Sequence, residues 1–255
     1  MMYHNRKSAF TLSEVLITLG IIGVVAALTI PNVIANYQKH AASTAVKKMY
    51  SMLNQALNLS KQEYGMERFP KIVGPQAAKV FMEQYLNKHL SVSGVCNSIS
   101  ECYGDKQISF LKGDAIYYDI NYFVVLNNGG YLGCTQSGNA GFQLFYDING
   151  AGKPNVIGKD IFMYYYFPTD VYLSRGELVV SIASSDIAFK VPNEDRIYAG
   201  GYFGYLPAEV LPREQLINTT GGHYGCNKLS YASYTGSLCA ALIMIDGKVS
   251  NDYPW

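Results

Sequence analysis

The sequence has few charged residues and almost no net charge. Asp, Glu, Lys and Arg make up 15% of its 255 residues, and 20 basic side chains balance 19 acidic ones. A balance this even provides no global basic field for nucleic acid, so no nucleic-acid partner is expected. The hydrophobic share of 49% is large enough for a buried core.

Motifs of catalysis are also missing. The sequence has no G-x-S-x-G, no H-E-x-x-H and no Walker-type glycine loop. Its histidines are scattered, and only His223 lies near a cysteine, Cys226, that it could activate as a base. We expect Cys226 to be half of a disulfide instead. The sequence therefore does not indicate an enzyme.

Cysteine is scarce, and no two of the five cysteines form a C-x-x-C pair. This disfavours a zinc or redox site. Short spacing favours disulfides Cys96–Cys102 and Cys226–Cys239 in an oxidising compartment, with Cys134 left over, although other connectivities stay open. Tryptophan occurs once whereas tyrosine occurs 22 times, a composition that suits pleated, half-exposed surfaces and favours a β-rich globular part.

One long apolar run follows a short polar start. Residues 1–9 are polar and include Arg6 and Lys7, whereas residues 10–30 are apolar apart from Thr, Ser and Glu14. As a helix the run would extend about 31 Å, close to the roughly 30 Å of a bilayer's hydrocarbon core. No A-x-A site closes it, so an ordinary secretory signal fits poorly. The basic leader predicts a cytoplasmic N-terminus and an exported remainder.

Glu14 is the one ionisable residue inside this run. A carboxylate in a membrane span is costly and calls for a partner. If the chain were cut between Ala9 and Phe10, the new α-amino group of Phe10 would be a cation at the same depth, in this subunit or in a neighbour. Pairing with that amine would offset the cost of burying Glu14. The alternative is that Glu14 extends to the nearby lipid headgroups.

Residues 7–31 together resemble the prepilin-type cleavage and methylation segment of the type IV pilin-like family. They read K-S-A-F-T-L-S-E-V-L-I-T-L-G-I-I-G-V-V-A-A-L-T-I-P. The resemblance implies that a prepilin peptidase removes the leader after Ala9, that Phe10 is N-methylated, and that Glu14 guides assembly. The family usually has Gly before the cut, so Ala9 predicts slower processing.

The resemblance also implies a function and a location. The chain would be a structural subunit of a type IV pilus or a type II secretion pseudopilus. It would cross the bacterial inner membrane once, with its globular domain periplasmic or extracellular, before entering a filament. Its partners would be identical or related pilin subunits, the prepilin peptidase, the inner-membrane assembly platform and membrane lipid. The alternative is an exported binding or enzymatic domain that uses the helix only as an anchor.

The helical pattern continues beyond the apolar run. Gly20 and Gly23 weaken a helix and Pro31 removes a backbone donor, so a bend is expected near these residues. Apolar residues then recur at steps of three and four through residues 31–65, which predicts one long helix. A second helix is predicted over residues 74–90, with an inward face formed by Ala78, Phe81, Tyr85 and Leu86.

Short alternating segments follow in the globular part, residues 66–255. Strands are predicted at residues 115–120, on both sides of Asn128-Gly129, and at residues 143–147, 160–167, 177–182 and 240–245. The Asn-Gly pair indicates a hairpin turn. An antiparallel sheet packed on the long helix is the simplest arrangement, which gives an α+β, pilin-like fold.

One loop contains candidate metal ligands. In the loop D-I-N-G-A-G-K-P-N-V-I-G-K-D, Asp147, Asn149 and Asp160 could offer oxygens to calcium. The spacing departs from an EF-hand. The same residue types also suit tight turns without any ion, because Asn and Gly accept left-handed conformations. The loop resembles one in pseudopilin-like proteins, some of which bind calcium. No other cofactor is expected.

Overall fold

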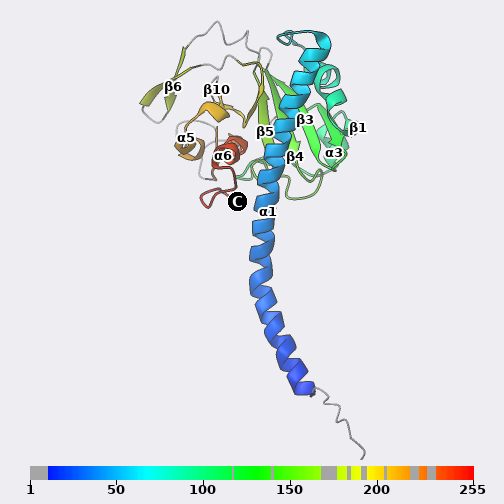
Figure 1. Ribbon diagram of the computed structural model, residues 1–255, viewed down its shortest axis with the longest axis vertical. Coiled ribbons are helices and arrows are strands. Elements are labelled where there is room, and N and C mark those ends of the chain that lie inside the picture. Colours follow the sequence, from blue (N-terminus) through cyan, green and yellow to red (C-terminus); the bar gives the residue numbers. More distant parts are fainter. Residues whose placement is uncertain are drawn as a thin grey trace, which may run out of the picture. The chain divides into compact units, whose positions relative to one another are not determined.

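The fold is described from a computed structural model (Figure 1). The structure describes residues 11–116, 118–138, 141–167, 177–182, 185–190, 194–203, 206–218, 224–228 and 234–255. The chain divides into two units, Met1–Ala41 and Ala42–Trp255. The division falls inside the first helix, whose residues are mostly exposed before Ala42 and form a buried stripe from Ala42 onward.

Helix α1 (Leu12–Tyr64) is continuous over 53 residues, as the periodicity predicts. Gly20, Gly23 and Pro31 all lie inside it, so the bend expected there is not a break in the helix, and the bend itself stays a prediction. From Ala42 onward one stripe is buried at steps of three and four. Its core members Val46, Leu53 and Leu57 are fully buried.

The second predicted helix is one helical segment with three geometries. It comprises α2 (Ala77–Phe81), the π-helix η1 (Met82–Leu86) and the 3₁₀ turn η2 (Asn87–His89). The predicted inward face is confirmed, because Ala78, Phe81, Tyr85 and Leu86 are all buried. Phe81 stacks on Phe142 of the sheet with ring centroids 4.2 Å apart, which fixes this segment against the sheet.

A six-stranded antiparallel sheet forms the centre of the second unit, and it confirms the α+β class. Its order is β1-β2-β3-β4-β5-β8. The strands are β1 (Val92–Cys96), β2 (Tyr122–Leu126), β3 (Tyr131–Ser137), β4 (Gly141–Asp147), β5 (Ile161–Tyr166) and β8 (Ile197–Ala199). Asn128-Gly129 makes the predicted β2–β3 turn, with φ of +84° at Gly129.

Smaller elements surround this sheet. Pairs of short strands are β6 (Glu177–Ile182) with β7 (Ser185–Lys190), β9 (Tyr202–Phe203) with β10 (Leu206–Pro207), and β11 (Tyr224–Gly225) with β12 (Tyr234–Thr235). The remaining helical segments are α3 (Ile99–Tyr103), η3 (Ala208–Val210), α5 (Arg213–Asn218) and α6 (Cys239–Asp246). The predicted strand at residues 177–182 matches β6.

Both faces of the sheet are covered. One face, with Val124, Leu132 and Tyr164, shares a core with the second half of α1, which crosses the sheet in Figure 1. The other face, with Phe123, Phe145 and Met163, packs against residues that include Ile108 and Phe110. Two-sided burial explains why the aromatic strand β5 is buried along its whole length.

Two predicted strands are wrong. Residues 240–245 belong to helix α6, which ends at Asp246 and is capped by Gly247 with φ of +69°. A short apolar run does not distinguish a strand from a helix. Gly247, which directly follows the run of helical residues, is the residue type that commonly ends a helix. Among the described residues of the 115–120 segment there is only an isolated bridge from Ala115 to Ser109. This segment pairs locally instead, with Ile116 N–H donating to Ile108 O at 3.2 Å.

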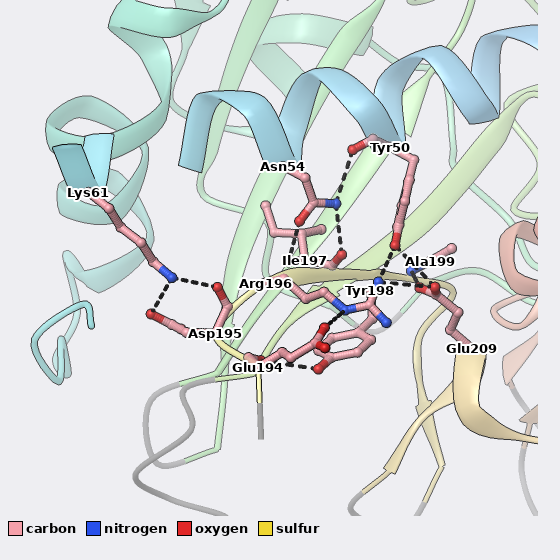
Figure 2. Close-up of polar contacts among 10 residues, drawn as sticks. All are labelled: Tyr50, Asn54, Lys61, Glu194, Asp195, Arg196, Ile197, Tyr198, Ala199 and Glu209. Carbon is pink, nitrogen blue, oxygen red and sulfur yellow. Dashed lines mark hydrogen bonds and ion pairs between the residues drawn. The ribbon is translucent and has the colours of Figure 1, made fainter. Parts of the chain in front are cut away.

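Polar contacts fasten helix α1 to edge strand β8 (Figure 2). The Asn54 amide donates to Ile197 O and accepts from Ile197 N–H, each at 3.0 Å, as a neighbouring strand would. Lys61 forms an ion pair with Asp195 at 3.1 Å. Tyr50 donates to Glu209 at 3.0 Å, and Glu209 in turn accepts from Ala199 N–H at 2.9 Å. The sheet edge is therefore closed by side chains of the helix.

We expect Asn54→Ala to lower the free energy of unfolding by about 2 kcal/mol, because it leaves the buried N–H and C=O of Ile197 unpaired. Denaturant unfolding of the full chain in lipid nanodiscs measures this. Gln55→Ala, on the exposed side of the same helical turn, is the matched control. Equal stability of the two variants would contradict this role for Asn54.

Candidate functional site

The first part of α1 is an apolar helix surface that its own chain leaves uncovered. Leu12, Leu16 and Leu28 are 79%, 60% and 70% exposed. An 18-residue window of this helix has a mean hydropathy of 2.2 and no buried residue. Among the described residues, α1 is the one helix long and apolar enough to cross a membrane. Exposed apolar surface of this extent marks a membrane or protein contact.

Glu14 takes part in the N-terminal cap of this helix. Its Oε2 accepts from the backbone N–H and from the hydroxyl of Thr11, each at 2.8 Å, and Glu14 N–H donates back to the Thr11 hydroxyl at 3.3 Å. This reciprocal arrangement is a capping box. The T-x-x-E signature of this cap is readable in the sequence at residues 11–14, and it gives Glu14 a local role in addition to the assembly role that the family resemblance implies.

The capping box binds Glu14 to Thr11, the residue that comes two positions after Ala9 in the sequence. Cleavage would convert the backbone nitrogen of Phe10 into an amine. Thr11 directly follows Phe10, and the Glu14 carboxylate already accepts a hydrogen bond from the backbone N–H of Thr11. Ala9, Phe10 and the rest of the leader lie outside the described residues. Cleavage, methylation and the assembly role of Glu14 therefore stay predictions.

The cysteines pair as their spacing favoured. Disulfides join Cys96 to Cys102 and Cys226 to Cys239. Cys226 is therefore no nucleophile, and His223, its hypothetical base, lies outside the described residues. Cys134 is free and buried, and burial raises the pKa of its thiol far above the ordinary value. A thiol held protonated in a core is chemically inert.

The loop after β4 brings together all three candidate metal ligands. The Asn149 N–H donates to Asp147 Oδ1 at 3.0 Å, and the neighbouring Ile148 N–H donates to Asp160 O, also at 3.0 Å. Asp160 accepts from the N–H groups of Asn155 and Val156 at 2.8 and 2.7 Å. The two carboxylates are 1% and 4% exposed as residues. They organise the loop by accepting its backbone N–H groups.

Within the described part of the chain, the carboxylates of Asp147 and Asp160 form no ion pair with a basic side chain. Burial, together with the negative charge of Asp160, raises the pKa of Asp147 to about 8. The pKa of Asp160 is also raised, mainly by burial. Tyr103 donates to Asp147 Oδ2 at 3.0 Å. Among the described residues there is no cluster of three or more His, Cys, Asp or Glu side chains suited to a metal. Calcium binding by Asp147, Asn149 and Asp160 stays a prediction.

Stability should depend on the proton held at Asp147. Because the pKa is about 8 in the folded chain and 3.8 as the ordinary value, the folded state binds the proton more tightly. The free energy of unfolding should therefore fall as pH rises from about 4 to about 8. Thermal unfolding of the full chain at several pH values measures this, and Asp147→Asn should flatten the dependence. Glu67→Gln, at an exposed carboxylate, is the control and should leave it unchanged.

The same series tests calcium. An ion bound between Asp147 and Asp160 would replace the proton, so millimolar calcium would raise the melting temperature most near pH 8, and would do so only with Asp147 intact. The absence of a calcium effect at every pH would end the calcium hypothesis. A pH-independent melting temperature would contradict the raised pKa itself.

Comparison with known proteins gives two family matches. The model of the prokaryotic N-terminal methylation motif, the signature of type IV pilins and pseudopilins, matches residues 4–30. The model of a family of unknown function (DUF6613) matches residues 32–175. This second match includes the rest of α1 and strands β1 to β5. No curated protein and no solved structure matches the chain.

Proposed function

Because the chain belongs to the family of unknown function DUF6613 and carries the N-terminal methylation motif, we propose that it is a structural subunit of a type IV pilus or a type II secretion pseudopilus. Its motif is that of prepilin peptidase substrates, and proteins with this motif are generally structural. The observation that carries the proposal is the uncovered apolar surface of α1 before Ala42, on a helix whose cap contains Glu14.

Processing is the first step of the proposal. The peptidase cuts between Ala9 and Phe10, and Phe10 is then N-methylated. The new amine lies next to Thr11, whose N–H the Glu14 carboxylate already accepts. Cleavage therefore puts a positive charge where a carboxylate is within reach, either in the same chain or in a neighbouring one. The match of the motif to residues 4–30 supports this reading.

Covering the apolar helix surface is the second step. Before assembly, lipid covers the exposed side chains of α1, and the chain is anchored in the inner membrane with its globular domain outside. In the filament, the corresponding helices of identical or related subunits replace the lipid. A Cβ added at Gly20 or Gly23 would meet no described atom within 4 Å beyond the helix's own backbone, so both glycines offer room for close helix contact.

Replacing Glu14 separates this function from that of a simple anchor. Glu14→Ala should leave the chain in the membrane and cut its incorporation into sheared filaments by about tenfold or more, because the neighbour's amine loses its partner. Immunoblots of the sheared and membrane fractions measure this. Ser13→Ala, the adjacent position in the same helical turn, should assemble normally.

Normal filament incorporation of Glu14→Ala would contradict the assembly role. If the variant also keeps the full cellular function of the protein, the chain is better described as a membrane-anchored exported domain. Calcium binding by the loop after β4 would be compatible with either result, since that loop lies in the globular unit.

A further inference from the structure

A pocket of about 400 Å³ opens beside the disulfide Cys96–Cys102. One wall is formed by helix α3 and the residues around it, from Asn97 to Gln107, and the other by residues 119–121 before strand β2. The pocket lies entirely in the globular unit, so binding there would not depend on filament assembly. Its size is in the range of small-molecule sites.

The walls of the pocket are fixed by contacts that need no ligand. The disulfide closes the chain around α3, and Ser98 caps the helix by accepting from Glu101 N–H at 3.1 Å. The Lys106 ammonium donates to Ala151 O at 2.5 Å, which ties this wall to the loop after β4. On the other wall Asp119 O accepts from the Thr135 hydroxyl at 3.0 Å. The pocket is therefore held in shape before any ligand arrives.

Four side chains in the pocket are not used by the fold. Asp105, Gln107, Asp119 and Asn121 all line it. Within the described part of the chain, the carboxylates of Asp105 and Asp119 and the amides of Gln107 and Asn121 have no hydrogen-bond or ion-pair partner. All four residues are exposed to solvent. They leave carboxylate acceptors beside amides that both donate and accept.

The chemistry of the lining selects among ligand classes. Two carboxylates and one lysine, which is already engaged with Ala151, disfavour phosphates and other anions. A largely apolar ligand would find little to pack against besides Ile99, because Ile120 is only 1% exposed. Carboxylates and amides instead suit neighbouring hydroxyl groups, and the partly exposed Ile99 suits the C–H face of a ring. We propose that this pocket binds a neutral, hydroxyl-rich ligand, a saccharide.

Saturation-transfer NMR tests the proposal with the full chain in phosphatidylcholine nanodiscs. The probes are methyl α-D-glucoside, methyl β-D-galactoside and methyl N-acetyl-β-D-glucosaminide at millimolar concentration, with empty nanodiscs as the background. At least one glycoside should show saturable transfer. The double variant D105A/D119A should weaken its binding by about tenfold or more, because it removes two charged acceptors. Glu67→Ala, at an exposed carboxylate outside the pocket, should bind like the wild type.

Several results would overturn the saccharide pocket. One is the absence of saturable transfer to all three glycosides while circular dichroism shows the chain folded. Another is equal binding by the wild type and D105A/D119A. A third is calcium bound through Asp105 and Asp119 with no glycoside binding, which would make the pocket a cation site. Filament incorporation of D105A/D119A should stay normal, so failure of this inference is distinguishable from failure of the proposed function.

Discussion

Helix α1 has two different surfaces along one continuous helix, and this difference constrains the rest of the molecule. From Ala42 onward a single stripe is buried against the sheet, whereas the preceding residues expose leucines, isoleucines and valines around the helix. Leaving so much apolar surface in water is unfavourable by roughly 25 cal/mol per Å². The first part therefore requires lipid or other helices, and a filament subunit meets both requirements at successive stages.

The globular unit is built to hold the second part of α1. Its sheet is buried on both faces, and the helix covers one of them. Side chains of the helix also close the edge of the sheet, since Asn54 occupies the hydrogen-bonding positions of a missing strand beside Ile197. Helix α3 and the end of strand β4 lie within the same unit and are joined by the hydrogen bond from Tyr103 to Asp147. The unit thus has one sheet face that packs against α1, and, away from that face, a polar contact between Tyr103 and Asp147.

Patterns with a strong local cause were predictable from the sequence. The length of α1, the Asn128-Gly129 turn and the inward face of the second helix follow from periodicity and turn chemistry. Residues 240–245 were not predictable in this way, because an apolar run of this length satisfies strand and helix equally. The contacts of Asn54 with Ile197 and of Tyr103 with Asp147 join residues far apart in the sequence. Only the folded chain shows them.

The bond between Ala9 and Phe10 matters most for the proposed function, because cutting it creates the amine that Glu14 is proposed to pair with. Ala9 replaces the glycine usual at this position, so cleavage here is also the step most open to failure. Intact-protein mass spectrometry on the chain purified from cells with an active prepilin peptidase tests it directly. The expected result is a chain that begins at Phe10 and carries one added methyl group. A chain that keeps its leader, or begins at another residue, would contradict the proposed processing.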